Sequence, residues 1–130
     1  MGLPHFELCV QTHFSAAHHL VGYEGNCAQP HGHNWSVQVH VSCRKLNAVG
    51  IAIDFRELKA SISNVIQELD HADLNTLPAF ADLNPSSELI AQYIYRTVAS
   101  RMNGLDVRIT KVVLGETPSY SVTYSERGSE

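Results

Sequence analysis

Three histidines lie close together in the sequence in a pattern that can bind a metal ion. His31 and His33 flank a single glycine, and in an extended segment residues two apart point to the same side. A third imidazole could come from His18 or from His19, at the start of the same long loop. Three imidazoles with one open position describe a catalytic zinc site, whereas four ligands close a structural one. The spacing therefore predicts a metal site, and the alternative is a pair of surface histidines around a turn glycine.

Cys27 lies four residues before His31, which places its thiol near the same predicted site. Beside a zinc ion or a protonated histidine the pKa of a thiol falls, and thiolate is available at neutral pH. Cys27 could then be a fourth ligand, which would make the site structural, or a general base just outside the coordination sphere. The alternative is a buried inert thiol, and we assign that role to Cys9 and Cys43, which fit strand positions.

Three more side chains could move protons or bind a substrate. Asp70 precedes His71, and a carboxylate beside a histidine can set its tautomer and raise its basicity. Adjacent Asp-His pairs also occur by chance, and from these residues alone a helix C-cap is the favoured interpretation. Glu116 lies between two strand-like runs, where its carboxylate could accept paired hydrogen bonds from the amidine-like edge of a heterocycle. Taken alone, a solvated turn residue is the simpler interpretation of Glu116.

Hydrophobic periodicity predicts the elements that position these residues. Alternation with a period of two over residues 6–14 and 35–43 predicts half-buried strands, separated by a loop at about 15–33. A loop of this length without an element of its own is usually functional. Two helices should follow, one starting at the N-cap Asp54, the other capped by Ser86 or Ser87. The strand-like runs Val107–Leu114 and Tyr120–Tyr124 come last.

The order ββααββ predicts an α+β fold of one domain, residues 1–130, with two helices on one face of a four-stranded antiparallel sheet. Such a sheet leaves two edges unpaired, and natural proteins cover or close their edges. Closing several sheets into a ring would remove the edges. We therefore expect a homo-oligomer.

Composition and charge narrow the classes of function. The net charge of −4 and the scattered basic residues argue against a nucleic-acid-binding surface. No apolar run approaches the roughly 20 residues of a membrane helix, and no signal peptide is recognisable, so we expect no membrane partner. Three cysteines without framework spacing suggest reduced thiols and a cytoplasmic location. The eight histidines in 130 residues are the unusual feature of the composition.

Several motifs occur in the order found in one family. The chain resembles the 6-pyruvoyltetrahydropterin synthase / 6-carboxytetrahydropterin synthase family from about Phe6 to Tyr124. The motifs are Phe14-Ser15-Ala16-Ala17-His18, Cys27-x-x-x-His31-Gly32-His33-Asn34, Leu69-Asp70-His71-x-x-Leu74-Asn75, Asn84-Pro85-Ser86-Ser87-Glu88 and Glu116-Thr117-Pro118. This resemblance implies the tunnelling fold, in hexamers built as a dimer of trimers whose sheets close into a barrel.

The resemblance also implies roles for the candidate residues. It assigns Zn2+ to His18, His31 and His33, and so prefers His18 to His19. It makes Cys27 the proton-abstracting base. His71, paired with Asp70, becomes the second acid–base group. Glu116 becomes the residue that anchors the pterin ring, with a possible place in the proton relay.

The spacing between the cysteine and the histidine pair looks like one branch of the family. Three residues separate Cys27 from His31, as in the 6-carboxytetrahydropterin synthases of the queuosine (7-deazaguanine) pathway. The implied reaction converts 7,8-dihydroneopterin triphosphate into 6-carboxy-5,6,7,8-tetrahydropterin, acetaldehyde and triphosphate. The alternatives are a pyruvoyl-forming or merely pterin-cleaving synthase, a zinc hydrolase with three histidine ligands, and a non-catalytic metal-binding module. Gly115, where many relatives have Lys, and the pair Ser86-Ser87 depart from the family pattern.

Overall fold

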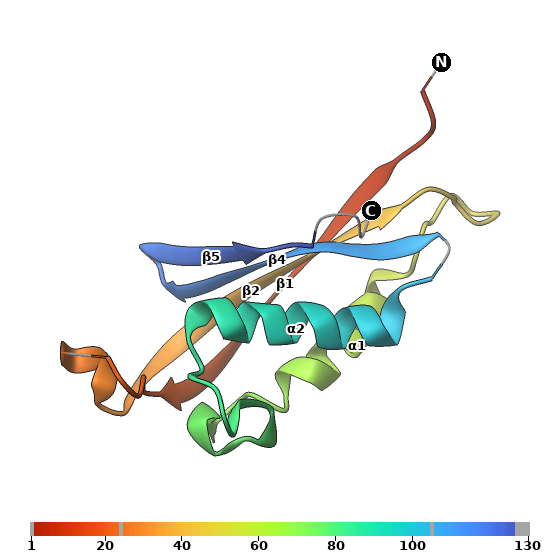
Figure 1. Cartoon of the computed structure of the whole chain (residues 1–130). Helices are drawn as coiled ribbons and strands as arrows, with labels where there is room; N and C mark the ends of the chain where they lie inside the picture. The colour runs from red at the N-terminus through yellow and green to blue at the C-terminus, as the bar shows by residue number, and fades with distance from the viewer. Residues whose placement is uncertain (1, 24, 105, 127–130) are drawn as a thin grey trace.

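The computed structural model describes residues 2–23, 25–104 and 106–126, without the side chains of Asn26 and Cys27. A five-stranded sheet has the order β3-β1-β2-β4-β5. Figure 1 shows both helices packed on the same face of this sheet. The elements are β1 (Phe6–His18), η1 (Gly25–Ala28), β2 (His31–Cys43), α1 (Phe55–Ile66), β3 (Ala72–Asp73), η2 (Leu74–Thr76), η3 (Pro78–Phe80), α2 (Ser87–Met102), β4 (Val107–Thr117) and β5 (Tyr120–Tyr124).

The predicted α+β architecture is confirmed, with one addition to the sheet. The four predicted strands pair antiparallel, and the two-residue strand β3 pairs parallel to Ala16 and Ala17 of β1. Two residues show no periodicity, so a sequence pattern could not reveal β3. Asp54 and Ser86 cap α1 and α2, since their side chains accept hydrogen bonds from the backbone N–H groups of Arg56 and Leu89.

The predicted loop over residues 15–33 is too long. β1 continues to His18 and β2 begins at His31, because Ser15–His18 pair with His31–Asn34 in the same antiparallel register as the rest of the hairpin. The connection shrinks to residues 19–30, which contain η1. The segment is rich in Gly, His and Asn, so its composition did not indicate strand. The ends of β1 and β2 are nevertheless strand, because they pair with each other.

The core lies between the helices and the inner face of the sheet. Trp35, Val37 and Val39 of β2 are at most 1% exposed, and Leu58 of α1 and Ile90 of α2 are fully buried against the same cluster. The period of two along β1 and β2 continues beyond this core to their connected ends. Side chains at those ends therefore extend the buried face rather than the polar one. Within the described residues, neither helix has the length and apolar character needed to span a membrane.

Candidate metal centre

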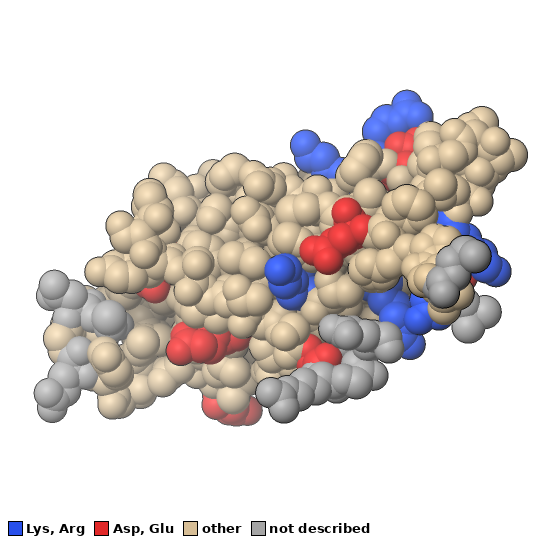
Figure 2. Space-filling model, turned by 90° about the horizontal axis from the view of Figure 1, so that it is seen from above, with Lys and Arg blue, Asp and Glu red and all other residues tan. Residues whose placement is uncertain are grey.

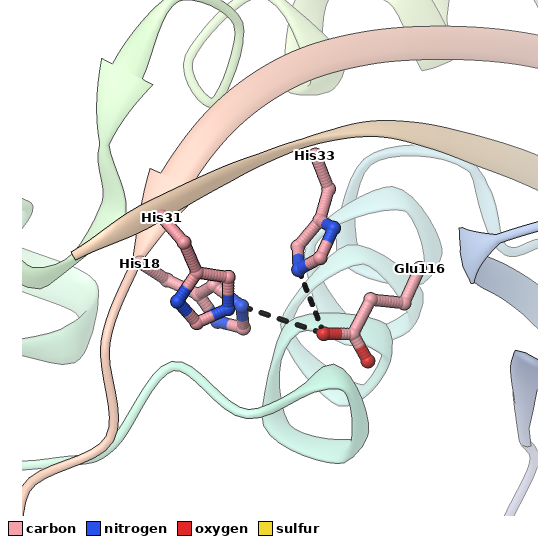
Figure 3. Close-up of side chains that lie close together, drawn as sticks. All are labelled: His18, His31, His33 and Glu116. Atoms are coloured by element: carbon pink, nitrogen blue, oxygen red, sulfur yellow. Dashed lines mark ion pairs between the residues drawn. The ribbon is translucent and has the colours of Figure 1, made fainter. Parts of the chain in front are cut away.

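The strand register brings three histidines together at the connected ends of β1 and β2. His18 and His31 are direct cross-strand partners, and His33 lies two residues further along β2, on the same face. The centroids of the His18 and His31 rings are 4.5 Å apart, and those of His31 and His33 are 4.8 Å apart. The three rings and the carboxylate of Glu116 converge in Figure 3. We call these four residues the histidine cluster.

Two backbone carbonyls set the tautomers of two of these imidazoles. His18 Nδ1 donates to the carbonyl oxygen of Pro85 at 2.7 Å, and His31 Nδ1 donates to that of Gln29, also at 2.7 Å. A carbonyl oxygen can only accept, so each Nδ1 carries the hydrogen and each neutral ring keeps a lone pair on Nε2. Metal-binding histidines commonly have this kind of partner behind them.

The Nε2 atoms of the cluster converge on one carboxylate oxygen. His18 is 3% exposed, and its buried Nε2 forms no hydrogen bond with a described residue. A buried polar atom left unsatisfied costs about 1–3 kcal/mol. The Nε2 atom of His33 is buried too, and Glu116 Oε1 pairs with it at 2.9 Å. One ligand atom from each of the four residues lies within 4.8 Å of all the others, and imidazole nitrogens converging beside a carboxylate fit a divalent metal ion.

Burial shifts the titration of His33 toward the ligand form. Desolvation lowers the pKa of His33 below its ordinary value, the charge of Glu116 opposes this, and the neighbouring His18 and His31 lower it further. The neutral imidazole is the form that binds metals. The environment of His33 therefore favours metal binding over protonation.

Glu116 comes from β4, the strand that pairs with β2, at an irregularity in the pairing of β4 with β5. The register between β4 and β5 shifts between Gly115 and Thr117, with Glu116 between them. Such bulges re-aim side chains, often beside active sites. Glu116 Oε1 lies 2.9 Å from His33 Nε2 and 3.6 Å from His18 Nε2, while Oε2 accepts a hydrogen bond from Ser87 Oγ at 3.0 Å.

Two asparagines hold the segment that follows His18. Asn75 accepts from the backbone N–H of His19 at 2.9 Å and donates to its carbonyl at 3.0 Å. Asn84 makes the same pair of bonds to Val21, both at 2.8 Å. Each amide side chain thus bonds the backbone N–H and carbonyl of one residue, His19 or Val21, as a neighbouring strand would. His19 lies within this clamped segment, and its side chain is not part of the histidine cluster.

Trp35 forms the floor of the site. Its side chain is fully buried, and its ring lies edge-to-face against His18 and His33, with centroid distances of 5.1 Å. Its Nε1 donates to the carbonyl of Ala16 at 3.2 Å, which ties the ring to β1. This packing restricts the imidazoles to a narrow range of orientations.

Asp70 and His71 lie apart from the histidine cluster in this chain. Asp70 Oδ1 lies 3.0 Å from His71 Nδ1 and accepts from the backbone N–H of Ser15 at 2.9 Å, and the His71 side chain is 82% exposed. His71 has a φ of 57°, a left-handed conformation uncommon for a residue with a side chain. The two residues are joined, but no described hydrogen bond or ion pair links them to the cluster.

Two hollows lie around these residues. One, of about 490 Å³, is lined by His71 and by His33 of the histidine cluster, together with Ser15 and Asn34. The other, of about 370 Å³, is lined by His18, His31 and Glu116 together with Tyr23 and the residues that begin α2. They share no lining residue. His71 therefore faces the same hollow as His33, whereas His18, His31 and Glu116 line the other one.

Cys27 belongs to η1, shortly before His31, but its side chain lies outside the described part of the chain. Sequence reasoning missed the functions of Ser87, Asn75 and Asn84. All three stand inside the motifs that carry the family resemblance, which was the available signal.

The chain is similar to proteins that act on reduced pterins. A family model described as 6-pyruvoyl tetrahydropterin synthase matches residues 7–127. A Bacillus subtilis protein named 6-carboxy-5,6,7,8-tetrahydropterin synthase is 31% identical over 131 aligned positions, covering 95% of this chain and 88% of the relative. A Pyrococcus furiosus protein named dihydroneopterin monophosphate aldolase is 32% identical, covering 84% of this chain and 88% of the relative.

A solved structure extends the likeness to three dimensions. Caenorhabditis elegans 6-pyruvoyl tetrahydropterin synthase matches with a TM-score of 0.85 and 27% identity, over 95% of this chain and 97% of that chain. These three similar proteins carry three different activity names. The likeness therefore shows the family, and the reaction needs a further argument.

Proposed function

Since the chain belongs to the 6-pyruvoyl tetrahydropterin synthase family, we propose that it makes 6-carboxy-5,6,7,8-tetrahydropterin. The substrates are 7,8-dihydroneopterin triphosphate and water, and acetaldehyde and triphosphate are the other products. The observation that carries the proposal is the set of three converging imidazoles in a chain whose cysteine precedes His31 by four residues. This spacing resembles the carboxy-forming branch, whose product feeds the queuosine pathway in the cytoplasm.

His18, His31 and His33 would hold the metal ion, which we propose to be zinc because three nitrogen ligands with one exchangeable position are typical of catalytic zinc. Bound there, zinc supplies Lewis-acid chemistry that acidifies a hydroxyl of the substrate side chain. The carbonyls of Pro85 and Gln29 keep the ligand nitrogens unprotonated at Nε2. Trp35 and α2 exclude water from the inner side of the cluster.

The remaining residues would bind the pterin and move protons. Glu116 accepts hydrogen bonds from the amidine-like edge of the ring, with Ser87 holding its second oxygen. Cys27 removes a proton from the side chain as triphosphate leaves. His71, oriented by Asp70, transfers protons during the internal redox step and the cleavage that releases acetaldehyde. A positioned acid or base of this kind contributes about 10²–10⁴-fold to the rate.

The separation of His71 from the cluster supports sites shared between copies of the chain. We propose that the Asp70–His71 pair of one chain completes the cluster of another, in a hexamer built from two trimers. No described Lys or Arg lines either hollow, so the triphosphate also needs cations from elsewhere. In Figure 2 the basic side chains lie toward the end of the molecule away from the connected ends of β1 and β2.

Product analysis tests the proposal. Zinc-loaded protein is incubated with 7,8-dihydroneopterin triphosphate, and the products are identified by mass spectrometry. We expect 6-carboxytetrahydropterin and acetaldehyde; His40→Ala, whose histidine lies on the other face of the sheet, serves as a matched control that retains turnover. Unchanged substrate with zinc bound would reject the enzyme assignment.

A pyruvoyl product would keep the same metal ligands and assign the sister activity. A second candidate function follows from the Pyrococcus furiosus relative, whose name specifies an aldolase acting on dihydroneopterin monophosphate. Release of glycolaldehyde phosphate, the two-carbon fragment that keeps the phosphate ester when the side chain is cleaved, would favour it. A simple zinc hydrolase with three histidine ligands is a more distant alternative, and it should tolerate the loss of Cys27.

A further inference from the structure

Positive side chains gather at a third hollow, on the polar face of the sheet. This hollow, of about 650 Å³, is lined by Arg44, Arg108 and Lys111. They are three of the nine Lys and Arg residues in a chain whose net charge is −4. We call this hollow the basic hollow.

The three cations follow the direction of β2 in order. Lys111 pairs with His40 and Arg108 with Ser42, and Arg44 directly follows the end of β2. Positions two residues apart in a strand are separated by about 7 Å. The positive charges therefore form a row along the sheet rather than a single point.

An irregularity in strand pairing turns Lys111 toward this row. The register of β4 on β2 shifts after His40, and Thr110 is the extra residue on β4. Ile109 and Val112 are fully buried, whereas Thr110 and Lys111 between them are partly exposed. Strict alternation would have sent Lys111 to the same side as Ile109, into the core. The bulge therefore re-aims a lysine onto the polar face.

Two of the cations have no carboxylate partner. Arg44 and Lys111 form no ion pair with a described residue, whereas Arg56, Arg96 and Arg101 each pair with a carboxylate. Two carboxylates, from Glu7 and Asp106, also line the basic hollow, so positive charge exceeds negative. Glu7 Oε1 faces His40 Nδ1 at 2.9 Å. A bound anion would neutralise the excess.

We propose that the basic hollow binds a polyphosphate anion. Guanidinium groups bind phosphate oxygens in pairs, and an ammonium group adds a point charge. The hydroxyls of Ser42, Thr110 and Ser125 line the same hollow and can donate further hydrogen bonds. A row of cations matches an elongated anion with several charges better than a single phosphate. The volume also falls within the range of about 300–1,000 Å³ that small-molecule sites occupy.

The basic hollow is separate from the histidine cluster. Ser42 lies eleven residues beyond His31 along β2, or about 35 Å, and no residue of the cluster lines the basic hollow. A substrate held by the metal ion of the same chain is too far away to place its triphosphate there. The inference therefore goes beyond the proposed function and does not depend on it. The anion is either free inorganic triphosphate or the triphosphate ester of a second molecule, since both carry the same group.

Isothermal titration calorimetry with inorganic triphosphate tests the inference without enzyme turnover. We expect the Kd to rise about tenfold in Lys111→Ala and in Arg44→Ala, because each change removes a charge-assisted hydrogen bond. Lys59→Ala is the matched control, since it removes the same charge from α1, outside the basic hollow, and its Kd should equal that of the wild type. His31→Ala should also keep the wild-type Kd, because the anion does not contact the metal site.

Two results would overturn the inference. One is an equal Kd for triphosphate in the wild type, Lys111→Ala and Arg44→Ala. The other is loss of triphosphate binding in His31→Ala, which would place the anion at the metal ion. Orthophosphate should bind at least about tenfold more weakly than triphosphate, because it carries fewer charges along the row, and equal affinities would reject a polyphosphate site.

Competition identifies the source of the anion. His31→Ala protein, in which we expect no turnover, is loaded with inorganic triphosphate and titrated with 7,8-dihydroneopterin triphosphate. Displacement at equal concentrations would support a site that also takes the ester. Triphosphate that stays bound would support a site for the inorganic anion.

Discussion

The hairpin of β1 and β2 carries histidine-containing groups on both faces of the sheet, three histidines on the inner face and His40 on the polar one, and their ring nitrogens differ in what they contact. On the polar face, His40 Nδ1 lies 2.9 Å from Glu7 Oε1, and its Nε2 lies 3.7 Å from Cys9 Sγ and 3.4 Å from Gln38 Oε1. In the histidine cluster, the Nε2 atom of His18 has no hydrogen-bond partner among the described residues, and the Nε2 atoms of His18 and His33 both face Glu116 Oε1, at 3.6 and 2.9 Å. We call the polar-face group the His40 group.

By residue type alone, the His40 group looks more like a catalytic site than the histidine cluster does. Cys9, His40 and Glu7 offer a thiol, an imidazole and a carboxylate in contact, which are the residue types of a nucleophilic triad. Burial and the charge of Glu7 raise the pKa of Cys9, with Lys111 opposing, so the thiol stays protonated at neutral pH. Nitrogens with separate partners and a protonated thiol indicate a structural role. The convergence of several ring nitrogens on one point is the better sign of a binding site, since the buried Nδ1 of His19 also lacks a partner among the described residues and lies outside the cluster.

The largest expected difference between the two groups is in metal binding. His31→Ala should lower metal affinity by more than about 100-fold, because it removes a direct ligand rather than a supporting partner, and should abolish turnover. His40→Ala should keep both. Metal content after dialysis and chelator competition measure the affinities. Equal metal contents in the two variants would remove the distinction.

Replacing the cysteine beside each group should change the turnover rate differently for the two groups and should leave the bound metal in place. Cys27→Ala should retain bound metal and lose about 10²–10⁴-fold in turnover, as expected for a positioned base. Cys9→Ala should keep its turnover, because Cys9 lies on the polar face with a raised pKa. Single-turnover rates with metal-loaded variants provide the comparison. Full activity in Cys27→Ala would exclude this thiol from the mechanism.

The asparagines that hold the segment after His18 should affect the cluster more weakly. Asn84→Ala removes two hydrogen bonds to Val21, and we expect about tenfold weaker metal binding and a loss of about 1–3 kcal/mol in stability. Asn47 is the matched control, since it accepts from the backbone N–H groups of Val49 and Ile51, at 3.0 Å each. Asn47→Ala should lower stability without changing metal affinity. A similar loss of affinity in both variants would indicate a global effect.

The smallest expected effect concerns Asp70 in acid. The backbone N–H of Ser15, followed by His71, holds the pKa of Asp70 below its ordinary value, against a weaker effect of burial. A lowered folded-state pKa stabilises the protein above the unfolded value of about 3.9, and this contribution disappears as the pH falls through the folded value.

Asp70→Asn should therefore have a lower Tm than the wild type at pH 7, and the difference should shrink below about pH 4. Thermal melts between pH 7 and pH 2.5 measure it. A difference that stays constant with pH would mean that the charge of Asp70 does not stabilise the fold.

Local patterns determined much of the molecule. The spacing of two placed His31 and His33 on one side of an extended segment, and Asp54 and the Ser86-Ser87 pair marked the starts of the two helices. These features depend on the backbone geometry of a few neighbouring residues, which any sequence window contains. The family resemblance added the preference for His18 over His19, a choice that spacing had left open.

Tertiary structure alone decided which distant residues meet. The register of β1 on β2 sets His18 opposite His31, and a bulge in β4 aims Glu116, 83 residues after His33, at the same point. Packing at the start of α2 supplies the carbonyl of Pro85 and the hydroxyl of Ser87. The separation of His71 from the cluster also follows from the path of the chain. Such contacts depend on the pairing and packing of whole elements, which the period of a short segment does not contain.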